Sequence, residues 1–326
     1  MRVPRPSQQL FERALAVARS KPFRIGVVAC LSLLGAAAAA LTVRHFVTHG
    51  WPLSHADPLL VVAAGALLVG AYGAKALGWK RLFAREDRPS APALAAATGA
   101  ATVTGIALPG RFDDVVRVTV VRRFRTSKAG IGAICLSIVL VGFLDSAALT
   151  PLASVAAGLT DLSAWPRAGL AVVAAAGVGS TLIVLVLPRL ERNGRLARFR
   201  IVRWLSAHSA GTLDTAKAGL FIGVSWSLRA VALYILFIAL GLQASFVLAL
   251  LFLCASAASA ALPIAPAGQA TQAGAGAAVL ALAGVGASSA VAFAVAAQGL
   301  VVLTGAVVLL LAGAWEARGR VMAFGR

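Results

Sequence analysis

Long runs of apolar residues alternate with short basic stretches along most of the chain. The runs are rich in Ala, Leu, Val and Gly, and several approach or exceed the roughly 20 residues with which a helix crosses the hydrocarbon of a bilayer. We therefore predict an all-α, polytopic membrane protein with about six full transmembrane helices. The predicted spans are 23–43, 57–79, 129–158, 167–187, 218–241 and 287–313.

The overall composition agrees with this pattern. The chain has 326 residues, of which 60% are hydrophobic and 13% are charged, and its mean hydropathy is +0.89. A soluble domain of this size needs far more polar surface. The net charge of +19 comes largely from Lys and Arg between the apolar runs. This placement indicates contact with anionic lipids at the cytoplasmic leaflet and argues against a nucleic-acid partner.

The basic stretches also predict the side of the membrane that each loop faces. Several Arg and Lys residues precede the first span, so the positive-inside rule places the N-terminus in the cytoplasm. We expect an interfacial segment at 1–22 that is not a cleaved signal peptide, and a basic amphipathic segment at 189–217 on the same face. The C-terminal tail, 315–326, is expected in the cytoplasm too. The expected location is the bacterial plasma membrane.

Two further apolar segments, 91–120 and 246–284, are interrupted by proline. Both flanks of 91–120 are basic, and a single crossing cannot begin and end on one side, so this segment is predicted to be a re-entrant hairpin that enters from the cytoplasm. Alternation of the other spans requires 246–284 to be a hairpin from the outside. The predicted hairpin breaks are Pro109, Gly110, Pro263, Pro266 and Gly268.

The two halves, 23–158 and 159–314, then have the same order of elements in opposite orientations. This arrangement is an inverted-topology repeat, in which the substrate site lies near the membrane midplane where the two broken elements meet. The triplet Ala-Leu-Pro occurs at matching positions, 107–109 and 261–263. The alternative is that 91–120 and 246–284 contain ordinary spans with proline kinks.

Charged residues gather directly after the first break. In a helix that follows Gly110, Asp113 and Asp114 both lie within one turn of Arg117 and are predicted to pair with it. Arg111 then stays free at the helix N-terminus, where a guanidinium and backbone N–H groups suit a phosphate. The alternative is an ordinary interfacial salt-bridge cluster.

Two charged residues lie about midway along separate spans. Asp145 and Arg229 are predicted either to neutralise each other or to act as a handle for a proton or an anion during gating. Lys75 is expected to extend its ammonium group toward the membrane surface. Gln269 and Gln272, on one face after the second break, offer neutral hydrogen bonds to a substrate, and Gln298 is a further inward-facing candidate. 

The chain shows no pattern of an enzyme or of a cofactor site. It contains no catalytic triad, nucleotide-binding loop or paired acids suited to glycosyl transfer. His45 and His49 have the spacing of a metal pair but lack a third ligand at suitable spacing, so no metal site is predicted. The three cysteines lie far apart in apolar segments and are interpreted as small buried residues.

The run 108–117, Asp145 and the run 262–272 together resemble the lysylphosphatidylglycerol synthase/flippase transmembrane-region family. The likeness covers nearly the whole chain. In that family the membrane domain is regarded as a lipid flippase, and in bifunctional members a cytoplasmic aminoacyl-transferase domain follows it. The resemblance implies a stand-alone, flippase-like protein that is not an enzyme and has no synthase domain.

The resemblance also implies which positions belong to the site. Asp114 stands in the place of a usual Glu, Val141 and Gly142 stand in the place of a Glu-Arg pair, and Gln272 stands in the place of another Glu. The loss of charge at the last three of these positions implies a difference from other members of the family in the lipid headgroup that is recognised and in the coupling of transport to protons. The positions that match are Pro109, Gly110, Arg111, Asp114, Arg117, Asp145, Pro263, Pro266 and Gly268.

The leading hypothesis is a flippase-like transporter that moves a phospholipid or a polyprenyl-phosphate-linked lipid across the membrane. Arg111 and Arg117 hold the phosphate in this hypothesis, with Gln269 and Gln272 on the headgroup. One alternative is a non-transporting membrane partner of a lipid-modifying glycosyltransferase, with 189–217 as its docking surface. Another is a secondary transporter of a small solute. The residues leave a homodimer or an enzyme partner open.

Overall fold

The computed structural model describes residues 44, 47–48, 56–105, 112–124, 127–158, 164–192, 211–261 and 268–324. Within these ranges the chain forms nine α-helices and one 3-10 turn, and it contains no β-strand. The prediction of an all-α fold is therefore confirmed. The elements are α3 (Pro58–Arg81), η1 (Arg85–Asp87), α4 (Ala91–Thr104), α5 (Phe112–Arg123), α6 (Ile131–Gly158), α7 (Ala164–Arg192), α9 (Thr212–Ala239), α10 (Phe246–Ala261), α11 (Gly268–Leu282) and α12 (Ala287–Phe324).

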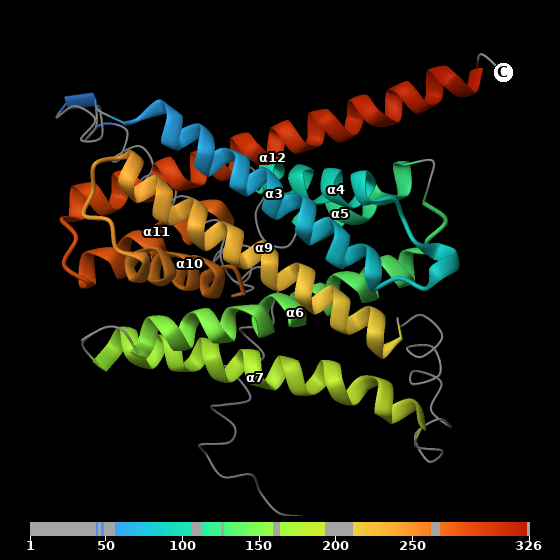
Figure 1. Cartoon of the computed structure of the whole chain (residues 1–326), viewed down its shortest axis with the longest axis horizontal. Coiled ribbons are helices and arrows are strands. Elements are labelled where there is room, and N and C mark those ends of the chain that lie inside the picture. The colour runs from blue at the N-terminus through green and yellow to red at the C-terminus, as the bar shows by residue number, and fades with distance from the viewer. Residues whose placement is uncertain are drawn as a thin grey trace, which may run out of the picture.

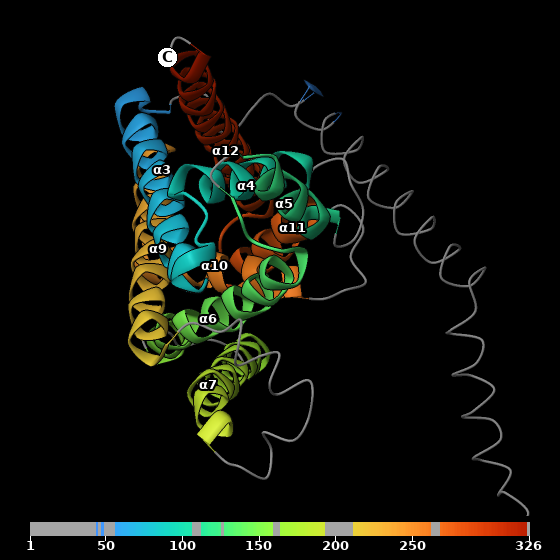
Figure 2. The same cartoon turned by 90° about the vertical axis from the view of Figure 1, so that its right-hand side faces the viewer.

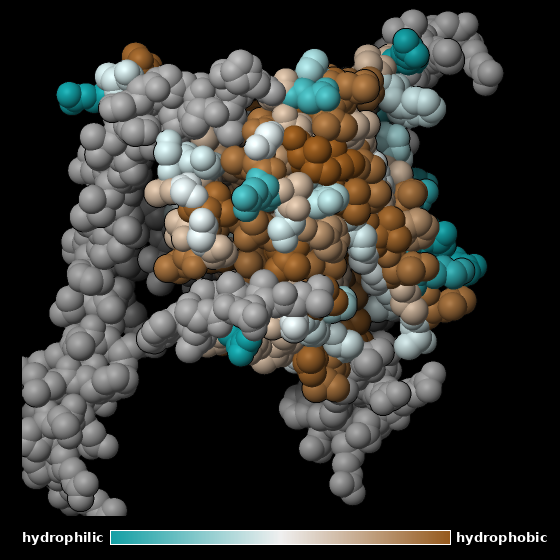
Figure 3. Space-filling view, turned by 60° about the vertical axis from the view of Figure 1, so that its left-hand side comes forward, coloured by the Kyte–Doolittle hydropathy of each residue, from teal (hydrophilic) through white to brown (hydrophobic). Residues whose placement is uncertain are grey.

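Five of these helices are long and apolar enough to cross a membrane. They are α3, α6, α7, α9 and α12, which correspond to five of the predicted spans. Their outer faces carry large apolar side chains that are exposed, for example Val172, Leu220 and Leu310. Figure 3 shows a face on which hydrophobic residues predominate. Lipid is the natural solvent for such a surface, so the chain is a multi-pass membrane protein.

Local sequence signals explain where several helices begin and end. Asp57 caps α3, because its Oδ1 accepts a hydrogen bond of 2.8 Å from Leu59 N, and Pro58 follows at the first helical position. Ser90 caps α4 in the same way, again ahead of a proline. Gly241 adopts a left-handed φ of 66° where the chain leaves α9.

The antiparallel pair of α3 and α9 makes the most extensive helix contact in the described structure. At one end Asp57 N donates to Ala239 O over 2.8 Å, and at the other Arg88 pairs with Asp214 over 2.6 Å. Between these ends, a Cβ added at Gly78 would lie 3.0 Å from a carbonyl oxygen of α9. Glycine thus permits close contact between two apolar helices, which the hydrophobic effect alone cannot hold together in lipid.

The other long helices pack around this pair. α6 contacts both α9 and α7, and Figure 2 shows α7 on the far side of α6 from the rest of the bundle. α12 contacts α4 most extensively and also contacts α11 and α3. α12 continues as one helix to Phe324, so the predicted tail 315–326 is a helical extension of the last span as far as that residue.

Four helices are too short to cross the bilayer alone. α4, α5, α10 and α11 contain 14, 12, 16 and 15 residues. At 1.5 Å per residue they are about 18 to 24 Å long, whereas the hydrocarbon is roughly 30 Å thick. α4 packs on α5 and α10 on α11. In Figure 1 the first pair lies toward the right-hand end of the molecule and the second toward the left.

Several sequence predictions fall outside the described residues. They include the interfacial segment 1–22, the span 23–43 and the middle part of the basic segment, 193–210. Arg111 and the breaks at Pro109, Gly110, Pro263 and Pro266 are also outside, whereas Gly268 is the first residue of α11.

Candidate functional site

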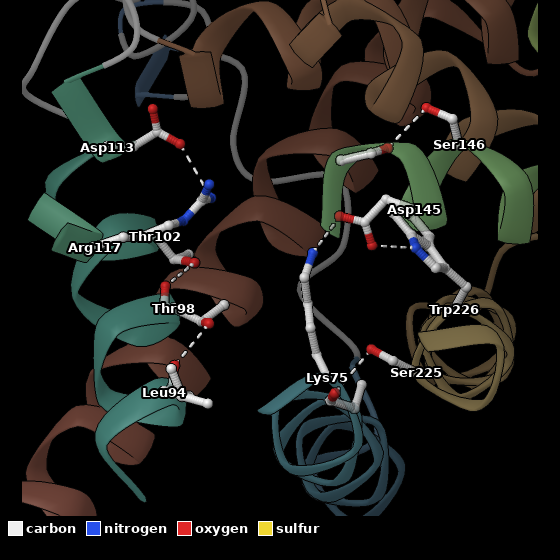
Figure 4. A network of polar contacts seen from close by, with 12 residues as sticks. Lys75, Leu94, Thr98, Thr102, Asp113, Arg117, Asp145, Ser146, Ser225 and Trp226 are labelled. Carbon is white, nitrogen blue, oxygen red and sulfur yellow. Dashed lines mark hydrogen bonds and ion pairs between the residues drawn. The ribbon is translucent and has the colours of Figure 1, made fainter. Parts of the chain in front are cut away.

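A cluster of polar side chains lies where α3, α6 and α9 meet, and Figure 4 shows it from close by. Lys75 Nζ lies 2.7 Å from Asp145 Oδ2. Trp226 Nε1 donates a hydrogen bond of 2.8 Å to the other carboxylate oxygen of Asp145. The side chains of Lys75 and Asp145 are only 13% and 20% exposed. Both carboxylate oxygens are therefore used inside the helix bundle.

The partner of Asp145 differs from the sequence prediction. Neutralisation by Arg229 was one of the two roles predicted for the two charges, but Lys75 pairs with this carboxylate instead. The expectation that Lys75 extends to the membrane surface is therefore wrong. In lipid the cost of an unpaired carboxylate exceeds the benefit of extending the lysine outward, and α3 lies next to α9 at the required depth.

Arg229 is held by aromatic rings. Its guanidinium carbon lies 5.5 Å from the ring centroid of Tyr72 and 5.3 Å from that of Trp226. These distances suit cation–π attraction, which is strongest where water is excluded. Among the residues with described positions, no carboxylate forms an ion pair with Arg229. The cluster of Tyr72, Lys75, Asp145, Trp226 and Arg229, here called the central cluster, thus contains two cations and one anion.

Tyr72 connects the central cluster to the rest of the bundle. Its hydroxyl oxygen lies 3.0 Å from Thr102 Oγ1 on α4 and 3.2 Å from the carbonyl oxygen of Val301 on α12. The ring is almost fully buried. The aromatic support of Arg229 is thereby tied to both a short helix and a long one.

Tyr72→Phe tests this connection. The ring that faces Arg229 is retained, but the hydrogen bonds to α4 and α12 are lost, so we expect the free energy of unfolding to fall by about 1 kcal/mol. Thermal unfolding in detergent measures the change. Tyr234→Phe is the matched control, because the hydroxyl of Tyr234 has no hydrogen bond to the described part of the protein. Equal effects of the two substitutions would contradict the role of the hydroxyl of Tyr72.

The acidic pair at the start of α5 binds Arg117 as predicted. Arg117 lies 3.1 Å from a carboxylate oxygen of Asp113 and 2.7 Å from one of Asp114. Figure 4 shows Arg117 beside α4, to one side of the central cluster. Arg117 and Arg229 both lie within electrostatic range of Lys75. Because two carboxylates already occupy Arg117, its guanidinium is less available to a phosphate than that of Arg229.

The two short helix pairs approach each other at Gln269. A Cβ added at Gly105, the C-cap of α4, would lie 3.6 Å from Gln269 Nε2 at the start of α11. The Oε1 atoms of Gln269 and Gln298 are buried without a hydrogen-bond partner in the described structure. The backbone carbonyl of Gln272 accepts a hydrogen bond of 3.0 Å from the hydroxyl of Ser256 on α10, which joins α11 to α10. Buried amide oxygens without a partner are costly, so Gln269 and Gln298 are suited to bind a polar ligand.

Other reactive side chains form no site in the described ranges. No group of three His, Cys, Asp or Glu side chains there lies close enough to hold a metal ion. Cys254 is buried as predicted, whereas Cys135 is exposed on the surface of α6, so the prediction that it is buried is wrong. His45 and His49 lie outside these ranges.

A polar cluster inside a bundle of apolar helices is typical of membrane proteins that act on a polar or charged substrate. The family model of the lysylphosphatidylglycerol synthase TM region matches residues 25–312, which is most of the chain. The protein belongs to this family. Membership relates the chain to a membrane region associated with lipid and not to a catalytic domain. No curated protein and no solved structure matches this chain.

Sequence reasoning about this family member missed Lys75, Tyr72 and Trp226. A signal for Lys75 was present, since any charge within an apolar run needs a partner. For Tyr72 and Trp226 the sequence carries no comparable signal, because aromatic residues are common in apolar helices. At two of the positions where the chain departs from the family pattern, Val141 is buried and a Cβ at Gly142 would meet open space.

Proposed function

We propose that this protein moves a lipid with a phosphate-containing headgroup between the leaflets of the bacterial plasma membrane. The observation that carries the proposal is Arg229, a cation within the bundle that lies over two aromatic rings and has no carboxylate partner in the described structure. A lipid phosphate supplies the missing negative charge. Membership of a lipid-associated membrane family supports the same substrate class.

The helix contacts support an inverted repeat, the architecture in which such a site lies between two halves. If α3, α4, α5 and α6 are exchanged with α9, α10, α11 and α12, the main contacts among these eight helices map onto each other. The contact of α4 with α12 corresponds to that of α10 with α6, and the contact of α3 with α12 to that of α9 with α6. In this proposal α4–α5 and α10–α11 are the two re-entrant hairpins.

The charges suggest how a headgroup is handled. Arg229 binds the phosphate, and its aromatic neighbours restrict the guanidinium so that less conformational entropy is lost on binding. The buried amides of Gln269 and Gln298 offer hydrogen bonds to the rest of the headgroup. The pair of Lys75 and Asp145 holds α3 against α6 and separates if the phosphate competes for the ammonium group. No covalent step is needed.

The ends of the helices support the proposed orientation. The C-terminal end of α3, the N-terminal end of α9 and the C-terminal end of α5 carry basic residues, among them Arg81, Lys217 and Arg122. By the positive-inside rule this end faces the cytoplasm, and the C-terminus then lies there as well. The N-terminus is placed on the same side by the sequence.

Arg229→Gln tests the proposal. In proteoliposomes that contain a fluorescent phosphatidylglycerol, bleached from outside by dithionite, we expect the rate of lipid movement to fall at least about tenfold, since a charge-assisted phosphate contact contributes about 1.4 kcal/mol or more. The rate of lipid movement by Arg229→Lys should lie between the rates of the wild type and of Arg229→Gln, because lysine keeps the positive charge but loses the planar stacking on the aromatic rings. 

The control for this test is Arg123→Gln, which removes the same charge from an exposed position on α5. It should move lipid at the wild-type rate. Wild-type movement by the folded Arg229→Gln protein would contradict the assignment of the phosphate site, and an absence of movement by the wild-type protein itself would contradict the proposed function.

A further inference from the structure

A second basic site lies away from the central cluster, at the end of the α3–α9 pair. A pocket of about 540 Å³ opens there between the last turn of α3, the connection to α4 and the first turns of α9. This volume is within the range of small-ligand sites. The residues that line it, here called the basic pocket, are Arg81, Phe83, Ala84, Arg85, Arg88, Gly211, Thr212, Leu213, Asp214 and Lys217.

The basic pocket has a strong excess of positive charge. Arg81, Arg85, Arg88 and Lys217 face a single carboxylate, that of Asp214. Glu86 and Asp87 of the neighbouring 3-10 turn do not line the pocket. Three positive charges therefore remain uncompensated by the residues of the pocket, and concave surfaces concentrate such a field.

The cations of the pocket fall into two groups. Asp214 holds Arg88 at 2.6 Å and Arg81 at 3.4 Å, so these guanidinium groups are fixed against the start of α9. Arg85 and Lys217 are exposed and form no ion pair within the described part of the chain. The fixed pair shapes the pocket, and the other two cations are available to a ligand.

Backbone donors add to this preference for an anion. Gly211, the N-cap of α9, has no side chain to bind the first N–H groups of this long helix. Gly211, Thr212 and Leu213, at the start of this helix, line the same pocket. A helix N-terminus carries a partial positive charge that favours phosphate.

The position of the pocket favours a lipid over a free anion. It lies at the ends of two membrane-spanning helices, where headgroups are found, and Leu213 in its lining is 70% exposed. An apolar side chain next to a basic pocket suits the boundary between a headgroup and its acyl chains. We propose that the basic pocket binds the phosphate headgroup of an anionic phospholipid of the adjacent leaflet and thereby stabilises the α3–α9 pair.

The test compares two double variants of the purified full-length protein in detergent. Arg85→Gln/Lys217→Gln removes the two available cations, and Lys80→Gln/Lys128→Gln removes the same charge from positions that do not line the pocket. Phosphatidylglycerol is titrated into each protein while the melting temperature is followed. We expect the lipid to stabilise the wild type and the control, and the pocket variant to need at least about tenfold more lipid for the same shift.

Three results would overturn the proposal. The first is an equal response of the pocket variant and the control, and the second is equal stabilisation by phosphatidylcholine. The third is equal stabilisation by inorganic phosphate, which would indicate a free anion as the ligand. When both pairs of substitutions are made in an Arg229→Gln background, which lacks the central phosphate contact, the pocket pair should still need at least about tenfold more phosphatidylglycerol than the control pair, so failure of this proposal is distinguishable from failure of the proposed transport function.

Discussion

Asp145→Ala is expected to destabilise the protein by roughly 3–5 kcal/mol, the usual cost of removing one partner of a buried ion pair. The ammonium group of Lys75, which is 13% exposed, loses its only ion-pair partner in the described structure. Trp226 Nε1 loses its acceptor at the same time. Thermal or denaturant unfolding in detergent measures the loss. Glu86→Ala, which removes an exposed carboxylate from the 3-10 turn, should have little effect.

The double variant Lys75→Met/Asp145→Leu separates the effect of an unpaired charge on stability from the role of the ion pair in lipid movement. Because both charges are removed, stability should recover in large part, although Trp226 still lacks its acceptor. If the pair takes part in the movement of lipid, as proposed, transport should stay low despite this recovery. A loss of stability in the double variant equal to the sum of the losses in the two single variants would show that the charges are not coupled.

Gly177→Ala is expected to destabilise the contact between α6 and α7. A Cβ at this position would overlap Thr150 Oγ1 and the carbonyl oxygen of Ser146. The carbonyl belongs to the backbone of α6 and cannot rotate away, so the helices must separate. Overpacking of this kind costs typically about 1–3 kcal/mol, and separation also forfeits the dispersion contacts of neighbouring residues.

Gly179→Ala on the same helix is a matched control. A Cβ at Gly179 would meet no atom within 4 Å. Both substitutions gain the same helix propensity, which favours Ala by up to about 1 kcal/mol, so the difference between them isolates the steric effect. Gly179→Ala should be neutral or stabilising in thermal unfolding. If the two variants unfold at the same temperature, α7 does not pack on α6 through Gly177.

Predictions that depend on neighbours in sequence agree well with the structure. Arg117 pairs with Asp113 and Asp114 because residues three and four apart on a helix are adjacent whatever surrounds them. Five of the predicted spans are present as long apolar helices for a similar reason, since the length of an apolar run is set by the bilayer.

The partners of Asp145 and Arg229 could not be predicted from neighbouring residues in the sequence. Two charges at similar depth in different spans can pair only if their helices are neighbours and are rotated toward each other. Lys75 satisfies both conditions with respect to Asp145, whereas Arg229 is turned toward Tyr72 and Trp226. Depth is readable from sequence, but the rotation of a helix in lipid is not, because an apolar helix has no polar face that must point outward.

The sequence by itself determined that the chain is a helical membrane protein, where five of its long spans lie, and which charges pair within one helix. These features depend on hydropathy, length and spacing, which are properties of short stretches of chain. Only the tertiary structure decided that Lys75 neutralises Asp145, that Arg229 lies over aromatic rings, and that four cations share a pocket at the end of α3 and α9. Those contacts join different helices, and in a bilayer the packing of small residues and polar groups, not the hydrophobic effect, selects which faces meet.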